Sequence, residues 1–351
     1  MITFTNLLEK LAVSYKKQLP FVAYNTPNSD CVNAIFQKND ALHYVKDFSE
    51  EGFVFAPFET HDSVVLIQKD TYYVAYKIEG KGLRGNSVSH KNELENDKNN
   101  HIEFVRKTIS FIQNSDVSKI VIARSKDIEV NDLDVLQVFE KLINAYEQAT
   151  CYIWYHPKVG LWLGATPETL LEIEGASFKT MSLAGTQRYR NSLDVEWGEK
   201  EIEEQQLVTD YVLSNLKSVS SNLKNSETYT VKAGSLLHLK TDISGEIIEN
   251  KGVKALIDVL HPTPAVCGFP RDASKKFILA NENFERTFYT GYLGEVNLNN
   301  KTSLYVNLRC MEKRASNQVR LFVGGGITSK SNPEKEWEET VAKCQTMESI
   351  L

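Results

Sequence analysis

VGGGITSKSNPEKEWEETVAKCQ, residues 323–345, joins a strand-like segment to a helix-like one through three consecutive glycines. Ser331 or Asn332 can cap the helix, and Pro333 suits its first turn. Backbone N–H groups in a glycine run can approach an anionic ligand closely. A tight bend without a ligand is the alternative, but the acidic helix that follows favours a binding role.

Pairs of glutamates mark two expected helices. Glu336 and Glu339 lie three residues apart and share one helix face, with Lys343 one turn beyond. In the earlier segment KEIEEQQLV, Glu201 and Glu204 have the same spacing. Like charges at this spacing repel each other, and a Mg²⁺ ion between the two helices would relieve that repulsion. Two solvated helix faces are the alternative interpretation.

Charged residues also interrupt apolar, strand-like segments. Lys119 directly precedes IVIA, Glu168 follows LWLG in GATPETLL, and Arg309 interrupts LYVNLRCM. Because an unpaired buried charge is costly, each side chain is expected either at an exposed edge or inside a site. Inside a site, a lysine can act as general base and a glutamate as general acid.

The remaining pattern predicts an α+β fold made of layers. Amphipathic helices are expected in HIEFVRKTISFIQ, DVLQVFEKLINAYEQ and KEIEEQQLVTDYVLSNLK, and strands in CYIWYH, YTGYLGEV, SLYVNLRCM and QVRLFVGGG. Long strands mixed with helices argue against a regular βαβ series. HKNELENDKNN, residues 90–100, is interpreted as an exposed linker, and SLAGTQR (182–188) and HPTPAVCGFP (261–270) as turns.

Composition limits the function classes. The chain has 351 residues, 42% of them hydrophobic, and a net charge of −6, which disfavours broad contact with nucleic acid or an anionic membrane. No stretch reaches 18 consecutive apolar residues, and the first residues lack a signal-peptide pattern. The five scattered cysteines predict neither a disulfide framework nor a zinc site. We therefore expect a soluble, cytoplasmic protein.

Eight segments, taken in order, resemble the chorismate-utilising enzymes. They are SKIVIAR, GATPETLL, SLAGTQR, KEIEEQQLV, HPTPAVCGFP, ERTFYTGYLG, LYVNLRC and the stretch 323–345. The resemblance implies a large α+β fold in which two related subdomains of antiparallel sheet, flanked by helices, surround a central Mg²⁺-dependent site. It also implies that residues 1–95 are the variable N-terminal part of this fold and that residues 96–351 form the chorismate-binding catalytic region.

Within that family, the resemblance favours isomerisation of chorismate to isochorismate, an isochorismate synthase activity. Ala184 stands where amine-transferring relatives with a covalent lysine nucleophile carry that lysine, and Lys119 stands where water-activating members have theirs. Salicylate synthase, which goes on to eliminate pyruvate, is the alternative. An ammonia-dependent anthranilate synthase component and a non-catalytic relative are less favoured. The expected partner is chorismate alone, without an obligatory glutaminase, and the pathway, menaquinone or siderophore, stays open.

The resemblance assigns roles residue by residue. Lys119 is expected to deprotonate the water that attacks C2, and Glu168 to protonate the C4 hydroxyl as it leaves. The expected Mg²⁺ ligands are Glu204 and Glu339, with Glu201 and Glu336 as their neighbours. The expected substrate-binding residues are Gly164, Thr186, His261, Tyr289, Arg309, Gly324, Gly326 and Lys343. Gln205 replaces a histidine common in relatives, a change expected to alter hydrogen bonding around the ligands.

Overall fold

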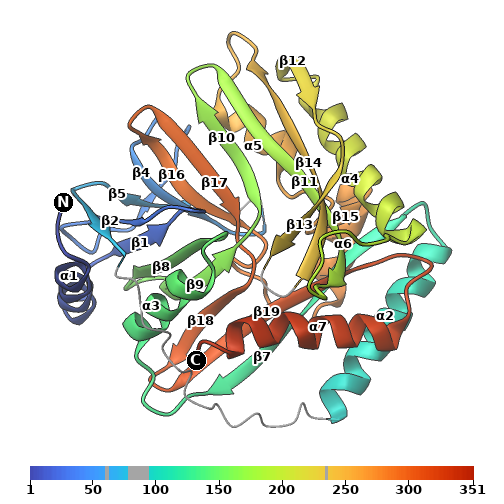
Figure 1. Ribbon diagram of the computed structural model, residues 1–351, viewed down its shortest axis with the longest axis horizontal. Helices are drawn as coiled ribbons and strands as arrows, with labels where there is room; N and C mark the ends of the chain where they lie inside the picture. The colour runs from blue at the N-terminus through green and yellow to red at the C-terminus, as the bar shows by residue number, and fades with distance from the viewer. Residues whose placement is uncertain (60–62, 78–94, 234–235) are drawn as a thin grey trace.

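A computed structural model of the chain describes residues 1–59, 63–77, 95–233 and 236–351 (Figure 1). Two large sheets, in which every paired strand is antiparallel to its described neighbours, form its centre, and helices lie outside them. This arrangement confirms the predicted α+β fold of sheets flanked by helices. Among the described residues, no helix combines the length and apolar character needed to cross a bilayer.

The first sheet has nine strands. In their order across the sheet, they are β15 (Gly268–Phe269), β7 (Lys119–Glu129), β19 (Gln318–Ile327), β18 (Cys310–Ala315), β9 (Gly160–Thr166), β8 (Thr150–His156), β1 (Phe21–Asn25), β2 (Cys31–Phe36) and β6 (Thr71–Tyr76). The long pair β7 and β19 carries both Lys119 and the glycine run, with Gly326 opposite Val121.

The second sheet has ten strands. In order, they are β12 (Ser220–Asn225), β14 (Leu236–Ile247), β11 (Ser177–Arg188), β10 (Thr169–Glu174), β17 (Lys301–Val306), β16 (Tyr292–Leu298), β4 (Gly52–Ala56), β5 (Val65–Gln68) and β3 (His43–Tyr44), while β13 (Tyr229–Ala233) also pairs with β14. The N-terminal segment thus supplies strands to both sheets. The proposed boundary near residue 95 stays a prediction.

The helices cover the outer faces of the sheets. They are α1 (Phe4–Lys16), α2 (Glu95–Gln113), α3 (Val135–Ala145), α4 (Glu199–Leu216), α5 (Val253–Leu260), α6 (Arg271–Asn281) and α7 (Pro333–Glu348). Helices α1 and α3 pack on the first sheet, α4 packs on β11 and β14 of the second, and α5 packs beside α4. Helix α7 packs on β19 and against α2 (Figure 1).

The two sheets meet through a core that is rich in aromatic side chains. Tyr24, Trp154 and Trp162 from the first sheet pack with Phe53 and Phe55 from the second. Alternate residues of the same strands point the other way, into the layer beneath α1 and α3. Strand β1 is therefore buried along its whole length, because both of its faces are covered.

Several predicted elements are confirmed. KEIEEQQLVTDYVLSNLK lies within α4 except for its last residue, which is the C-cap, IVIA lies within β7, and the last helix begins at Pro333. Asn332 is the N-cap of α7, because its side chain accepts a hydrogen bond from the Lys335 N–H. The three glycines lie near the end of β19, and this capped helix follows them, in the order that the sequence predicts.

Two predictions of irregular structure are wrong. Residues 95–100 of the expected linker form the first turns of α2, where Glu95 and Asp97 favour the positive end of the helix; residues 90–94 lie outside the described residues. SLAGTQR is not a turn but the end of β11. Its register shifts between Ala184 and Gln187, and Gly185 has a φ of 65°, so the glycine marks a bulge within the strand.

A buried ion pair fixes the edge of β7 beyond the point where β15 ends. Arg286 and Glu282 are 2% and 3% exposed and make two hydrogen bonds with each other, at 2.5 and 2.8 Å. Arg286 also donates to the Val121 carbonyl at 2.7 Å, and Glu282 accepts from the Ala123 N–H at 2.8 Å. The pair thus satisfies backbone groups that would otherwise lack a strand partner.

Replacing Glu282 by alanine should strongly destabilise the protein. The buried Arg286 charge would lose its counter-ion, which typically costs about 3–5 kcal/mol. Lys254 and Asp258 provide a matched control, because they have the same i, i+4 spacing but are both 57% exposed. Asp258→Ala should cost less than about 1 kcal/mol. Urea denaturation followed by tryptophan fluorescence measures both, and equal losses would contradict this account.

Candidate active site

A cavity of about 130 Å³ lies where β7, β19, β11 and β14 meet the helices α4 and α7. Ten of the residues that the sequence singles out line it together: Glu168, Thr186, Glu201, Glu204, Tyr289, Arg309, Gly324, Gly326, Glu339 and Lys343. Lys119 contacts one of these residues directly, and Glu336 adjoins the glycine run. The structure therefore gathers most of the predicted site in one place.

Lys119 is the most deeply buried cation of this group. It begins β7, its side chain is 2% exposed, and its Nζ donates to Glu204 Oε1 at 2.6 Å. Gly326 on β19 makes room for this contact. A Cβ at that position would lie 2.8 Å from Lys119 Cε and 3.1 Å from Glu204 Oε1, so any side chain there would push the pair apart. Contact between Lys119 and Glu204 is thus a steric reason for a glycine at position 326.

Glu168 lies between β9 and β10 and is buried against the same cavity. Burial raises the pKa of Glu168 from its ordinary 4.5 to about 7, and the nearby positive charge of Lys119 opposes the rise. A carboxyl with this pKa keeps a substantial protonated fraction near neutral pH. It can therefore donate a proton to a leaving group.

At this end of α4 and α7, the carboxylates that surround the cavity and the glycine run include three that each pair with a lysine. Besides the pair of Glu204 with Lys119, Lys343 Nζ lies 2.7 Å from Glu339 Oε1, and Lys200 Nζ lies 3.0 Å from Glu336 Oε1. Glu201 lies at the start of α4, where its Cβ would be 3.2 Å from a Cβ placed on Gly185.

The pKa values of Glu204 and Glu336 shift in opposite directions. Burial acts to raise the pKa of Glu204, but the charge and hydrogen bond of Lys119 outweigh it, so this pKa is lowered. Burial raises the pKa of Glu336, although Lys200 opposes the change. Of these two, Glu204, which contacts Lys119, is therefore held more firmly as a carboxylate.

Arg309 supplies a further cation, from the segment between β17 and β18. Its Nη2 donates to His238 Nε2 at 3.2 Å, and His238 Nδ1 lies 2.8 Å from the Gly185 carbonyl oxygen. Burial and the Arg309 charge lower the pKa of His238 to about 3, so this ring is neutral, with its proton on Nδ1. Burial also lowers the pKa of Arg309 to about 10.

His238 is a site residue that the sequence analysis missed. It lies in the alternating segment LLHLK of β14, and it interrupts apolar residues much as Arg309 interrupts LYVNLRCM. That signal was available, but a single histidine in a strand does not say which cation it contacts. The contact arises only because β14 lies beside β11 and faces the loop that carries Arg309.

Tyr289 and Lys343 also line the cavity. The Tyr289 ring stacks on Phe322, with ring centres 5.5 Å apart, and burial raises the pKa of its hydroxyl. Lys343 Nζ also donates to the Gly324 carbonyl at 2.9 Å. The side-chain hydroxyl of Thr186 lies 3.3 Å from His238 Nδ1. Cationic, phenolic and hydroxyl groups thus face one small space.

Two predicted substrate-binding residues lie away from the cavity. Gly164 lies within β9, where a Cβ would come 2.7 Å from the Tyr152 ring and 3.0 Å from Cys310 Cβ, so this glycine leaves room for the side chains of its partners on the neighbouring strands β8 and β18. His261 follows α5, and its ring packs edge-on against Tyr292 at 5.0 Å, facing a different cavity of about 800 Å³. The structure does not bring either residue to the site.

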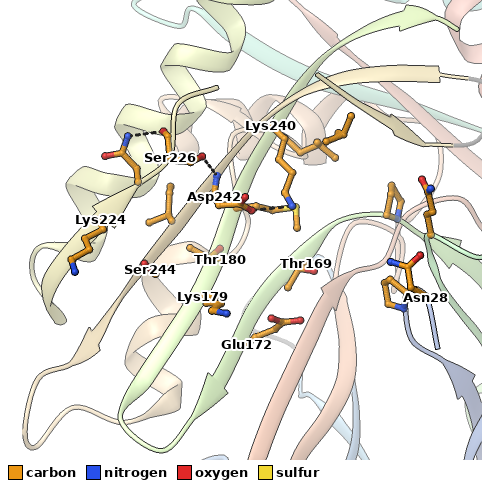
Figure 2. A pocket seen from close by; sticks show the side chains of 18 of the residues that line it. Asn28, Thr169, Glu172, Lys179, Thr180, Lys224, Ser226, Lys240, Asp242 and Ser244 are labelled. Carbon is orange, nitrogen blue, oxygen red and sulfur yellow. Dashed lines mark hydrogen bonds and ion pairs between the residues drawn. The ribbon is translucent and has the colours of Figure 1, made fainter. Parts of the chain in front are cut away.

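A larger cavity, of about 830 Å³, opens beside the first one (Figure 2). It lies against β10, β11 and β14, and the two cavities share Pro167 and Leu183. Lys240 and Asp242 form an ion pair at 2.9 Å there, and Lys179 and Glu172 are neighbours across the strands. Glu168, Glu204 and Arg309 line the smaller cavity and not this one, so the smaller cavity is the candidate active site.

Comparison with known proteins points to one family. The model of the family described as chorismate binding enzyme matches residues 62–351. Isochorismate synthase EntC of Escherichia coli K12 is 33% identical over 261 residues, which are 71% of this chain and 66% of that protein. Isochorismate synthase DhbC of Bacillus subtilis is 34% identical over 196 residues, 53% of this chain and 49% of that protein. The match therefore spans less than two thirds of these curated relatives.

Solved structures agree over nearly the whole chain. A Bacillus anthracis protein described as a 2,3-dihydroxybenzoate-specific isochorismate synthase, DhbC, superposes with a TM-score of 0.82 and 25% identity, covering 98% of this chain and 99% of that chain. The menaquinone-specific isochorismate synthase MenF of E. coli gives a TM-score of 0.77 at 19% identity, covering 95% and 88%. The second likeness concerns the fold alone.

Replacing Glu168 by glutamine should change how stability depends on pH. Because the folded-state pKa is raised, the stabilisation from this carboxyl is complete below about pH 4.5 and is lost as the pH rises through about 7. A rise from 4.5 to about 7 corresponds to roughly 3 kcal/mol. E168Q should therefore be more stable than the unmodified protein at pH 8, and the difference should vanish near pH 4.5.

Urea denaturation at a series of pH values measures this difference. A gap between the two proteins that stays constant across the series would show that Glu168 does not titrate in the way its burial indicates.

Proposed function

Because the chain belongs to the chorismate-binding enzyme family, we propose that it is an isochorismate synthase. It isomerises chorismate to isochorismate by adding water at C2 and losing the C4 hydroxyl. One observation carries the proposal: a buried lysine and a buried carboxyl with a pKa of about 7 adjoin the same small cavity. The names of the similar proteins, isochorismate synthases from several bacteria, agree with it.

The cavity suits a substrate with two carboxylates. Arg309 can hold one carboxylate through two parallel hydrogen bonds, and neutral His238 orients the guanidinium without competing for the anion. Tyr289 offers a hydroxyl that its raised pKa keeps protonated. On the other side, Lys343 and the backbone around Gly324 face the same space. These groups explain how a protein with a net charge of −6 can bind a dianion.

The acid and the base divide the reaction between them. Lys119 takes a proton from water while the water oxygen forms its bond to C2. The ring double bonds shift, the bond between C4 and its hydroxyl oxygen breaks, and Glu168 gives its proton to that oxygen, which leaves as water. One water enters and one leaves, so the net reaction is an isomerisation.

The site also has donors that suit Mg²⁺, which we propose as the cofactor; a metal-dependent activity is consistent with the family. Glu204, Glu339 and Glu201 offer carboxylate oxygens from two helices to one cavity. Within the described ranges, no three acidic, histidine or cysteine side chains converge as a ready-made metal group. Mg²⁺ does not need one, since it commonly binds one or two carboxylates, substrate oxygens and water.

When bound, Mg²⁺ would neutralise the ring carboxylate of the substrate. Glu204 and Glu339 would hold it, and Glu201 and Glu336 would lie next to them. We further propose that the enzyme needs no glutaminase partner and acts in the cytoplasm.

Product analysis tests the activity directly. Purified protein incubated with chorismate and Mg²⁺ should form isochorismate, identified by chromatography, and chelation with EDTA should abolish turnover. Added ammonium should not change the product. Salicylate with pyruvate would instead indicate a salicylate synthase, and anthranilate would indicate the ammonia-dependent reaction. No turnover under any condition would indicate a protein that binds chorismate without converting it.

Variants of the acid and the base should lose turnover rather than binding. Lys119→Ala and Glu168→Gln each remove a proton carrier, and kcat should fall roughly 10²–10⁴-fold. Arg309→Ala should mainly raise KM, because it removes a carboxylate contact. Steady-state kinetics measures both effects, and circular dichroism checks that each variant folds. Near-normal isochorismate formation by Lys119→Ala would show that another group activates the water.

A further inference from the structure

Lys200 lies between the acidic faces of α4 and α7. It is the second residue of α4, its Nζ donates to Glu336 Oε1 at 3.0 Å, and it lines the same cavity as Glu204 and Glu339. Burial acts to lower the pKa of Lys200, but the charges of Glu336, Glu204 and Glu339 outweigh it, so this pKa is raised. Carboxylates from both helices thus act on one ammonium group.

The three lysines of this group differ in how firmly they are held. Lys119 is enclosed at the start of β7, and Lys343 is held by the Gly324 carbonyl as well as by Glu339. The Lys200 side chain is 30% exposed, whereas Glu336 beneath it is 4% exposed. Lys200 is therefore the ammonium that can move toward solvent without crossing the protein interior.

The balance of carboxylates and ammonium groups around the cavity indicates when such a movement would be favourable. Glu201, Glu204, Glu336 and Glu339 face Lys119, Lys200 and Lys343, so four carboxylates meet three ammonium groups, with a formal charge of −1. Without Lys200 the formal charge is −2, which matches a divalent cation. Two like charges in the same low-dielectric space repel strongly, so the lysine and the metal compete.

We propose that Lys200 is a displaceable internal cation. It neutralises the carboxylates of α4 and α7 while the metal is absent, and it leaves toward solvent when Mg²⁺ enters. The proposal rests on the magnesium site put forward above. It follows that the metal should bind weakly by itself, since the ammonium must first be displaced, and more tightly with the dianionic substrate, which adds negative charge.

Measured Mg²⁺ affinity tests this role. Isothermal titration calorimetry with Mg²⁺ alone compares the unmodified protein with Lys200→Met, which keeps an unbranched side chain only one atom shorter and removes its charge. We expect Lys200→Met to bind Mg²⁺ about tenfold more tightly, because the competing charge is gone. Lys200→Arg restores the charge and should return the affinity toward that of the unmodified protein.

Lys330→Met is the matched control. Lys330 pairs with Glu203 of α4 at 3.1 Å, next to the start of α7, but both side chains are more than 60% exposed and neither lines the cavity. The same loss of charge at this position should leave the Mg²⁺ affinity within about twofold, because solvent screens exposed charges. A charge effect from anywhere on the surface would affect both variants equally.

Thermal unfolding gives an independent readout. In EDTA, Lys200→Met should unfold at a lower temperature than the unmodified protein, because the buried Glu336 carboxylate has lost its partner. Addition of Mg²⁺ should raise the unfolding temperature of this variant more than that of the unmodified protein.

The outcomes separate this proposal from those before it. Equal or weaker Mg²⁺ binding by Lys200→Met would overturn the role of Lys200 while leaving the metal site in place. A higher KM for chorismate with unchanged Mg²⁺ affinity would make Lys200 a substrate-binding residue instead, which also overturns it. Absence of Mg²⁺ binding by all the proteins would overturn the metal site together with this proposal, whereas isochorismate formation is judged separately by product analysis.

Discussion

The contact between Lys119 and Glu204 is the constraint on which the site depends. An ammonium that is 2% exposed needs a counter-ion close by, and Glu204 of α4 supplies it, so the first turns of α4 must approach the start of β7. That approach is possible because Gly326 on the neighbouring strand has no side chain to separate the pair. The glycine run, which in the sequence indicates an anion-binding loop, thus also serves as a spacer within a strand.

Neighbouring elements follow from the same constraint. Strand β7 must hold Lys119 in place although β15 covers only its first residues, and the buried pair of Glu282 and Arg286 takes over where β15 ends. The segment that carries this pair leads directly to Tyr289, so one ion pair positions both the strand of the base and the wall that faces the substrate. Rigid side-chain networks of this kind suit a site in which atoms must be placed accurately.

The sequence predicts those parts of the site that have a local signal. The i, i+3 glutamates place Glu201, Glu204, Glu336 and Glu339 on two helix faces, and the structure brings these faces together. Periodicity fails where the chain departs from its local pattern: Gly185 marks a bulge within β11 rather than a turn, and a polar segment begins α2. Residues such as His238 and Lys200 depend on which elements become neighbours, and a single sequence contains no period that reports this.

The charge of Lys119 separates the pKa values of two buried carboxyl groups, Glu168 and Glu204. Glu168 and Glu204 both border the same cavity, and burial acts to raise the pKa of each. Glu204 makes a direct contact with the Lys119 ammonium, so its pKa is lowered. Glu168 interacts with that charge without a hydrogen bond to it, so burial dominates and the pKa of Glu168 rises to about 7. A group that must bind a cation is thereby kept ionised, and a group that must donate a proton is kept partly protonated. Acid–base chemistry near neutral pH needs such a separation, and here it follows from the distance of two side chains to one buried charge.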